Sequence, residues 1–201
     1  MIEKTSFVRE RDFLNKHPLL IDFPQEITTE RLLIRIPHPG DGQSVFEAIQ
    51  ASKPELKKWL PFAQGEQTLE ETEINVREAH INFLKREDMR MHIFLKDTNT
   101  LIGSTGYHRP NWDIRKFEIG YWLDTRYCGN GYMTEAVSAL TDFAFQELQA
   151  NRIEIRCDEL NKQSSAVPER LHFQLEGILN SEDKAVDGEE LRNTCIYAKT
   201  K

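Results

Sequence analysis

Two glycines and an arginine lie close together in the run Arg126-Tyr-Cys-Gly-Asn-Gly131. A glycine permits backbone angles that are closed to other residues, and it lets a ligand approach the main chain. An amphipathic pattern starts directly after Gly131, so the run should lead into a helix. The first N–H groups of a helix lack partners within it and lie at the positive end of its dipole. The run therefore predicts a phosphate or diphosphate site, with Arg126 as an additional charged donor. The alternative is a tight strand-to-helix turn that binds nothing.

The segments on either side of this run must position it. Residues 116–124 alternate as a strand does. One face carries Phe117, Ile119, Tyr121 and Leu123, and the other carries Glu118, Gly120 and Trp122. The helix should cover about 131–148, and a second strand should cover 152–157. A strand, a helix and a strand in this order predict a right-handed crossover between two parallel strands.

The rest of the chain mixes strand and helix patterns. Thr68-Leu-Glu-Glu71 is a capping box that should start a helix. Prolines mark the ends of other elements, at Pro37 after a strand and at Pro61 after a short helical turn. We expect a strand at 30–36, helices at 41–52, 54–63 and 68–86, strands at 91–95 and 101–107, a helix at 164–172, and strands at 173–179 and 190–198. This order predicts an α+β, or mixed α/β, fold with a largely antiparallel sheet. Residues 1–26 resemble an N-terminal arm, and residues 27–201 a single domain.

The central motifs resemble a known family. Arg-x-x-Gly-x-Gly after a strand is similar to the acetyl-coenzyme A signature of the GNAT superfamily of N-acetyltransferases. Two neighbouring segments resemble the branch that contains the RimJ and RimL ribosomal-protein acetyltransferases. They are Glu118-Ile-Gly-Tyr-Trp-Leu123 and Gly131-Tyr-Met-Thr-Glu-Ala136. The resemblance extends over about residues 27–198, because the segments Thr29–Arg35, Leu56–Pro61 and Asn161–Gly177 are also similar to that branch. It implies a GNAT fold, with about seven mostly antiparallel strands, a splayed parallel pair and flanking helices.

The resemblance also implies where acetyl-coenzyme A, the co-substrate, would bind. The pantetheine arm would lie between the splayed strands, beside Tyr121, Trp122 and Leu123. Asn161 would bond the pantetheine amide region, although helix capping is an alternative role for Asn161 and for Ser164. The diphosphate would rest on backbone amides between Arg126 and Thr134, namely those of Arg126, Cys128, Gly129, Asn130, Gly131, Tyr132, Met133 and Thr134.

Amine acetylation needs a base, because a protonated amine cannot attack the thioester. The resemblance places Glu118 beside the thioester as that base, and a surface ion pair is its alternative role. His108 is a second candidate, since histidine titrates near neutral pH. Ser164 matches a serine that protonates the leaving thiolate in this branch. Two departures from the family pattern affect that segment: His172 replaces a usual glycine, and Pro168 lies inside the expected helix.

The acceptor amine is less well indicated than the donor. Within the resemblance, acceptor pockets are built near residues 41–63 and by loops, where Trp59, Phe62, His108 and Trp112 can contribute. A protein N-terminus is favoured over a small amine such as a polyamine, amino acid or antibiotic. A catalytically silent coenzyme-binding homologue stays open. A dinucleotide site at Gly129-x-Gly131-x-x-Thr134 with Asp158 is disfavoured, because only the 43 residues 159–201 follow Asp158.

Composition excludes several other classes of function. A formal charge of −7, from 26 basic and 33 acidic residues, argues against binding to nucleic acid. The histidines are scattered and no Cys-x-x-Cys occurs, so no metal site is expected. Three cysteines without close spacing indicate a reducing compartment, and no apolar run is long enough to span a membrane. We expect a cytoplasmic protein, and the family resemblance allows a homodimer.

Overall fold

A computed structural model describes residues 17–186 and 188–201. The described residues form one eight-stranded sheet in the order β1-β2-β3-β4-β5-β6-β8-β7. The strands are β1 (Glu26–Thr28), β2 (Leu32–Arg35), β3 (Met89–Leu95), β4 (Leu101–Asn111), β5 (Lys116–Leu123), β6 (Arg152–Asp158), β7 (Gln174–Lys184) and β8 (Leu191–Thr200). The α-helices are α2 (Gly42–Leu56), α3 (Leu69–Lys85), α4 (Tyr132–Gln146) and α5 (Lys162–Arg170), and the short 3-10 helices are η1 (Pro18–Leu20), η2 (Pro61–Ala63) and η3 (Thr125–Tyr127).

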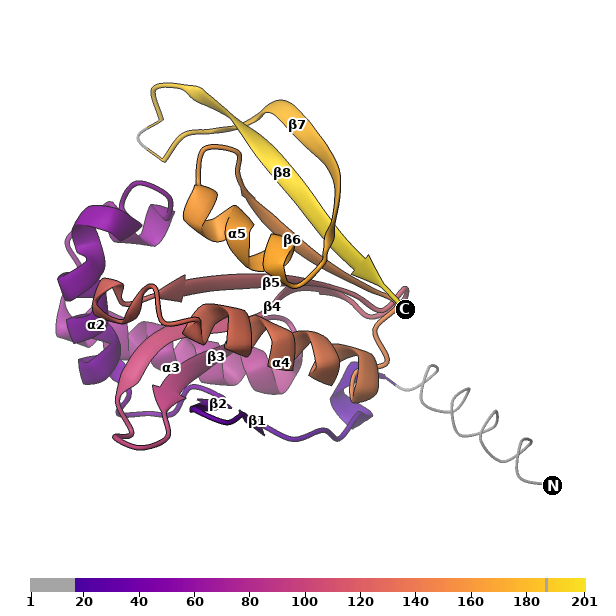
Figure 1. Ribbon diagram of the computed structural model, residues 1–201. Helices are drawn as coiled ribbons and strands as arrows, with labels where there is room; N and C mark the ends of the chain where they lie inside the picture. The colour runs from indigo at the N-terminus through magenta and orange to yellow at the C-terminus, as the bar shows by residue number, and fades with distance from the viewer. Residues whose placement is uncertain (1–16, 187) are drawn as a thin grey trace.

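The neighbouring strands β5 and β6 are parallel, and they soon separate. Their pairing runs from Lys116 opposite Arg152 to Glu118 opposite Glu154 and ends there. Beyond Glu118, β5 continues to pair with β4, while β6 continues to pair with β8. The sheet therefore opens between β5 and β6, and Figure 1 shows β6, β7 and β8 diverging from the rest of the sheet with α5 beside them. The expected splayed parallel pair and the expected mixed fold are confirmed.

Helices cover both faces of the sheet (Figure 1). Helix α4 packs on one face, where its Val137 and Leu140 join Phe117 and Ile119 of β5 in the main core. On the other face, Val45 and Ile49 of α2, Val76 of α3, and Phe94 and Leu101 of the sheet form a smaller cluster against which Trp122 packs. Because side chains alternate along a strand, β5 presents different residues to these two sides.

Several expected boundaries move in the structure. The sheet has eight strands rather than about seven, because the three residues of β1 pair with β2. Helix α2 passes Pro54 and ends at Leu56, whose side chain is buried, so the expected separate turn at 54–63 is reduced to η2. Strand β4 continues to Asn111, with a register shift between His108 and Asn111 that accommodates Pro110. The capping box at Thr68 and Glu71 is confirmed.

The last helix begins earlier than expected. Asn161 caps α5 by accepting a hydrogen bond from the Ser164 N–H at 3.1 Å, so the helix starts at Lys162 and not at residue 164. Pro168 lies inside it. At the other end of the chain, residues 1–16 of the expected arm lie outside the described residues. Ile21 and Phe23 belong to the main core, so the packed structure includes residues before Ile27.

Candidate active site

The loop after β5 leads into α4 as the glycines suggest. Gly131 precedes the helix with φ of 78°, and Gly129 has φ of 82°, both in the left-handed region that favours glycine. The first bond within the helix runs from the Glu135 N–H to the Gly131 carbonyl. The N–H groups of Tyr132, Met133 and Thr134 precede it, and no side chain among the described residues caps this helix. The start of α4 can therefore receive an anion.

The Arg126 side chain does not point freely at this loop. Its guanidinium bonds both carboxylate oxygens of Asp124, which is fully buried. The Asp124 carboxylate also accepts the Arg126 N–H at 3.0 Å. The side chain of Arg126 therefore links η3 to Asp124 at the end of β5. The Asp124 carboxylate largely balances the charge of the Arg126 guanidinium.

Arg31 is a cation at this loop that sequence reasoning missed. Its guanidinium donates to the Asn130 carbonyl at 3.0 Å, pairs with Glu135 and lies 4.5 Å from the Tyr132 ring centroid. It comes from the turn between β1 and β2, about a hundred residues earlier in the chain. Only the fold brings Arg31 to the start of α4. One hint of its importance was present in the sequence, because Arg31 lies in the segment Thr29–Arg35 that resembles the family.

The gap between β5 and β6 is bordered by hydroxyl and thiol groups. The Tyr121 hydroxyl donates to the Ser164 carbonyl at 2.8 Å, and the Ser164 hydroxyl lies 3.3 Å from the Tyr121 oxygen. Cys157 of β6 is nearby, and burial raises the pKa of its thiol to about 11. Tyr121, Ser164 and Asn161 are thus brought together, with Asn161 as the helix cap.

The opposite face of β5 carries Glu118. Its Oε2 lies 3.1 Å from Nη1 of Arg109, and its side chain is 17% exposed against 73% for Arg109. The ion pair that was the alternative role for Glu118 is therefore present. Because the Arg109 side chain lies largely in solvent, this ion pair stands at the surface and water can reach it.

His108 lies directly across from Glu118 on β4. Its Nδ1 is 2.6 Å from Oδ2 of Asp88, the residue before β3. A Cβ added at Gly120 would lie 2.7 Å from Cδ2 and 2.9 Å from Nε2 of His108, so only glycine leaves room for the ring. His108 and Glu118 therefore share one face of β5, beside the point where β5 leaves β6.

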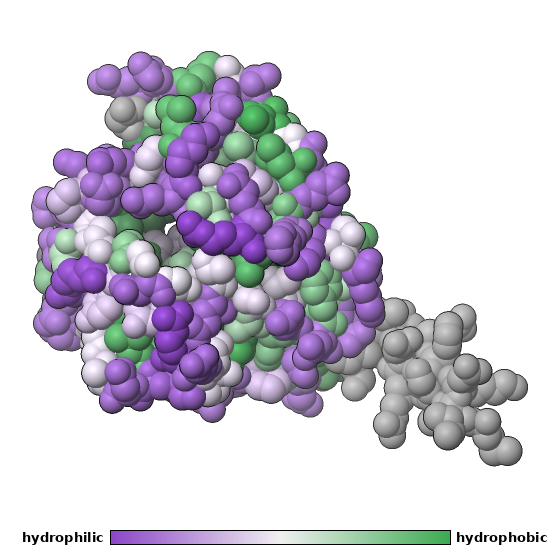
Figure 2. Space-filling model, viewed as in Figure 1, coloured by the Kyte–Doolittle hydropathy of each residue, from purple (hydrophilic) through white to green (hydrophobic). Residues whose placement is uncertain are grey.

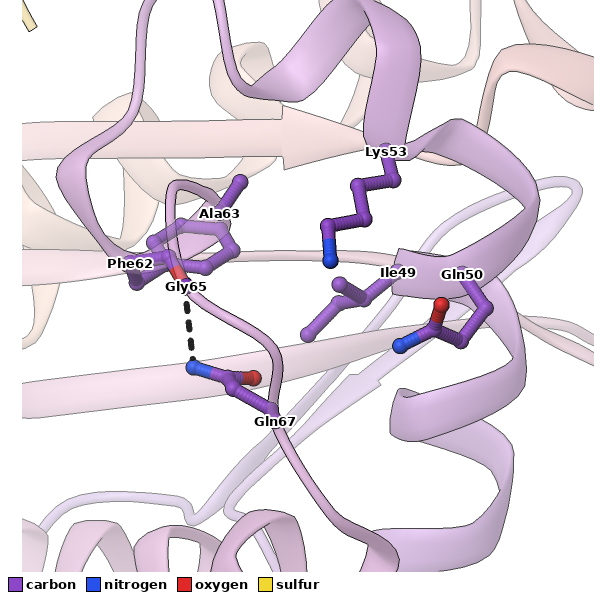
Figure 3. A pocket seen from close by; sticks show the side chains of 7 residues that line it. All are labelled: Ile49, Gln50, Lys53, Phe62, Ala63, Gly65 and Gln67. Atoms are coloured by element: carbon purple, nitrogen blue, oxygen red, sulfur yellow. Dashed lines mark hydrogen bonds between the residues drawn. The ribbon is translucent and has the colours of Figure 1, made fainter. Parts of the chain in front are cut away.

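The other expected acceptor residues do not form one pocket. Phe62 of η2 lies 6.2 Å from Trp122 between ring centroids, and Figure 3 shows it beside Lys53 and Ile49 over a small depression. Trp59 lines a cavity of about 230 Å³ together with Asp158 at the end of β6 and Arg192 of β8. The space-filling view is hollowed between the α2 region and the β6–β8 region (Figure 2).

Trp112 is not part of this surface. Its ring packs edge-on against Phe117 at 5.0 Å, and its Nε1 donates to the Arg86 carbonyl at 3.0 Å. Phe117 points to the α4 side of β5, away from Glu118. Trp112 therefore lies on the α4 side of β5, apart from Glu118.

Cys128, in the loop before α4, lacks the lowered pKa of a reactive thiol. The start of a helix can lower the pKa of a cysteine. Burial and the nearby Asp124 instead raise the pKa of Cys128. Among the described residues, no group of three or more metal-ligating side chains comes together.

The sequence also matches proteins that are already classified. A family model described as "Acetyltransferase (GNAT) domain" matches residues 31–174. The chain belongs to this GNAT acetyltransferase family. It is 34% identical over 162 residues to the "Putative ribosomal N-acetyltransferase YdaF" of Bacillus subtilis (strain 168), a match that covers 79% of this chain and 83% of that protein. It is 30% identical over 155 residues to the ribosomal-protein-serine acetyltransferase of Escherichia coli (strain K12), covering 77% of this chain and 84% of that protein.

Solved structures share the fold of this acetyltransferase. RimL, a ribosomal L7/L12 alpha-N-protein acetyltransferase in complex with coenzyme A, superimposes with a TM-score of 0.81 at 23% identity, covering 87% of this chain and 97% of RimL. The microcin C7 self-immunity acetyltransferase MccE, in complex with acetyl-CoA and AMP, gives 0.82 at 20% identity, covering 89% of this chain and 98% of MccE. The resemblance drawn from the motifs, the GNAT fold and the enzyme class are thus confirmed: the chain is an N-acetyltransferase. No helix in the described part of the chain could cross a membrane.

Proposed function

We propose that this N-acetyltransferase uses acetyl-coenzyme A to acetylate the N-terminal α-amine of a protein. One observation supports acetyl-coenzyme A as the donor. The pairing of β5 with β6 ends at Glu118 and Glu154, next to the uncapped helix start at Gly131. A diphosphate at the α4 amides and a pantetheine arm beside Tyr121 to Leu123 fit this arrangement. RimL and MccE, whose structures are complexes with coenzyme A and with acetyl-CoA and AMP, support the choice of donor.

Glu118 is the proposed base that accepts a proton from the acceptor nitrogen during acetyl transfer. The amine would approach from the Glu118 side of β5, and the carbonyl oxygen of the thioester would become an oxyanion as the nitrogen attacks. Ser164 is the proposed proton donor to the thiolate, because its hydroxyl lies at the Tyr121 side of the gap. No covalent enzyme intermediate is needed, and Cys128 has no part in this scheme.

The choice of a protein N-terminus follows the relatives. Two of them carry names that refer to ribosomal substrates, and RimL is named for the α-amine of a ribosomal protein. The cavity beside Trp59 is lined by three carboxylates and by the cations Lys58 and Arg192, so its charge favours neither kind of acceptor. Free cysteines at all three positions and a ribosomal acceptor favour a cytoplasmic location.

The donor is tested by calorimetric titration with coenzyme A and acetyl-coenzyme A. We expect saturable binding of both, and the absence of heat at millimolar ligand would contradict the donor site. The acceptor is tested with peptides that begin with serine or alanine, compared with spermidine and free amino acids, with thiol release as the readout. Faster release with peptides supports the proposal, and faster release with spermidine contradicts the protein acceptor.

The Glu118→Gln variant tests the base. Because a positioned base contributes about a hundredfold or more, we expect kcat to fall by about that factor. Affinity for coenzyme A should stay within about twofold, since Glu118 lies on the opposite face of β5 from Tyr121. The matched control is Glu176→Gln on β7, another carboxylate paired with an arginine. Full turnover of Glu118→Gln across pH would exclude Glu118 as the base.

A further inference from the structure

Asp88 and His108 form a hydrogen-bonded pair beside Glu118. Asp88 precedes β3, and its Oδ2 lies 2.6 Å from Nδ1 of His108 on β4. An ionised carboxylate only accepts hydrogen bonds, so Nδ1 carries the proton and Nε2 of the neutral ring is left as the acceptor. Asp88 thus fixes which nitrogen can receive a proton.

The ring is held against β5 by the absence of a side chain at Gly120. Nε2 and Cδ2 of His108 occupy the space that a Cβ at Gly120 would fill, at 2.9 and 2.7 Å. Gly120 is two residues past Glu118, where β5 has already left β6. The basic nitrogen therefore lies against β5 at Gly120, on the same face as Glu118 and at the level where β5 has left β6. His108 is 31% and Asp88 39% exposed, so water reaches the pair.

Two protons leave the acceptor nitrogen during the reaction, at different steps. An α-ammonium must lose one proton before its nitrogen can attack, and the nitrogen of the tetrahedral adduct loses a second as the C–S bond breaks. The leaving thiolate takes up one proton, so one proton in total is released to solvent. An α-ammonium has an ordinary pKa of about 8, against about 6.5 for an imidazolium and about 4.3 for a carboxylic acid. Transfer to an imidazole is thus unfavourable by about thirtyfold, and transfer to a carboxylate by a few thousandfold.

We propose that His108, positioned by Asp88, takes the first proton from the acceptor ammonium and passes it to water, while Glu118 takes the second. The proposal rests on the proposed function, and it assigns Asp88 as a positioning residue that acts only through His108. Ser164 gives its hydroxyl proton to the thiolate and is reprotonated from solvent. The adduct nitrogen is more acidic than the free ammonium, because it is bonded to the former carbonyl carbon, so a carboxylate suffices for the second step.

The Asp88→Asn variant tests this division of the two proton transfers between His108 and Glu118. With acetyl-coenzyme A and a peptide that begins with serine, we expect kcat to fall at least about tenfold while KM for acetyl-coenzyme A stays within about twofold. The charged groups near His108 are Asp88, its cross-strand partner Glu118, the next residue Arg109, which pairs with Glu118, and Arg90 of β3, which interacts with Asp88.

Companion variants separate positioning from folding. Asp88→Glu should recover part of the lost kcat, and Asp88→Asn combined with His108→Gln should lose little more than His108→Gln alone. Asp97→Asn, in the exposed turn at the other end of β3, is the matched control and should behave as the wild type. Asp88→Asn with a kcat like that of Asp97→Asn would overturn the proposal.

A second measurement does not need an acceptor. The nitrogen NMR signals of His108 should show the proton on Nδ1 in the wild type and a mixture of tautomers in Asp88→Asn. A wild-type ring with its proton on Nε2 would overturn the proposal even if acetyl transfer is observed. If no peptide or amine is acetylated by the wild type, the proposed function fails, whatever tautomer the ring adopts.

Discussion

Gly120 determines whether an imidazole can lie against β5. With alanine there, the new Cβ would lie 2.7 Å from Cδ2 of His108, closer than non-bonded atoms can approach. The ring is held at its other side by Asp88, so it must break that bond or tilt away from the strand. Glycine in a strand interior is otherwise unfavourable, and it often marks a close approach of another group.

The Gly120→Ala variant should therefore lose activity without losing the coenzyme. We expect kcat to fall about tenfold, with an overpacking cost of about 1–3 kcal/mol in the free energy of unfolding. Steady-state kinetics, calorimetry with coenzyme A and chemical denaturation measure the three quantities. The control is Gly177→Ala on β7, where an added Cβ meets nothing within 4 Å. Wild-type kcat in Gly120→Ala would show that the ring position is unimportant.

The residues of the site differ in how far the sequence alone could identify them. The glycines, Tyr121 and Glu118 stand in one continuous stretch, so a motif was enough to propose them. Asp88 and Arg31 are separated from their partners His108 and Glu135 by 20 and 104 residues. Such pairs are set by strand register and by the crossover of α4, which local patterns do not determine. The side of the sheet on which Trp112 lies depends on the turn after the register shift in β4, which local patterns do not determine either.

At the scale of elements, periodicity and capping residues predicted most helices and strands. The exceptions have physical causes. Pro54 did not end α2, because burial of Leu56 and the Lys53–Glu66 ion pair hold the following turn. The three residues of β1 carry too short a pattern to be recognised, and they form a strand because β2 offers an edge. Asn161 was expected inside the coenzyme site and is also the cap of α5.

The start of α4 is the element on which coenzyme binding should depend most. Gly131 has φ of 78°, where a residue with a Cβ costs about 1–2 kcal/mol. A shift of the loop to relieve this cost would turn the amides away from the diphosphate. We expect Gly131→Ala to weaken coenzyme A binding about tenfold, as measured by calorimetry. Gly188→Ala, also at φ of 78° but in the β7–β8 hairpin, should bind coenzyme A normally. Equal affinities for coenzyme A in both variants would contradict the proposed diphosphate site at the start of α4.

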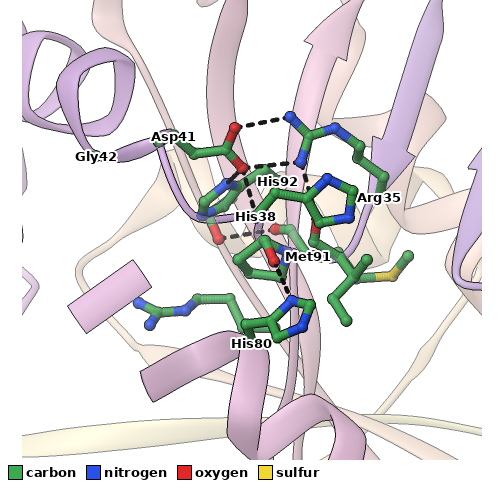
Figure 4. Close-up of polar contacts among 12 residues, drawn as sticks. Arg35, His38, Asp41, Gly42, His80, Met91 and His92 are labelled. Carbon is green, nitrogen blue, oxygen red and sulfur yellow. Dashed lines mark hydrogen bonds and ion pairs between the residues drawn. The ribbon is translucent and has the colours of Figure 1, made fainter. Parts of the chain in front are cut away.

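At the scale of the whole molecule, a buried polar network joins β2, β3 and α2. Figure 4 shows Asp41 between Arg35 and His92, with His38 and His80 beside them. Asp41 accepts from both Nη atoms of Arg35 at 2.8 Å, from the His38 N–H at 2.8 Å and from His92 Nδ1 at 3.1 Å. Burial alone would raise the pKa of Asp41, but these bonds outweigh it and hold that pKa well below its ordinary value.

His92 makes this network sensitive to acid. Its side chain is buried, and burial lowers its pKa below the ordinary value of 6.5, against the opposing effect of Asp41. In the unfolded chain the imidazole gains its proton near pH 6.5, while in the folded chain it stays neutral to lower pH. The stability that depends on neutral His92 is thus complete above about pH 6.5 and is lost as pH falls. Arg35 and Arg90 face the same ring and oppose its charging further.

We therefore expect the melting temperature to fall between about pH 7 and pH 5. His92→Asn keeps a donor for Asp41 but cannot titrate, so its melting temperature should change less over this range, whatever its value at neutral pH. His172→Asn, at an exposed position with φ of 58°, is the matched control and should keep the wild-type dependence. A fall in His92→Asn equal to that of the wild type would place the acid sensitivity elsewhere in the molecule.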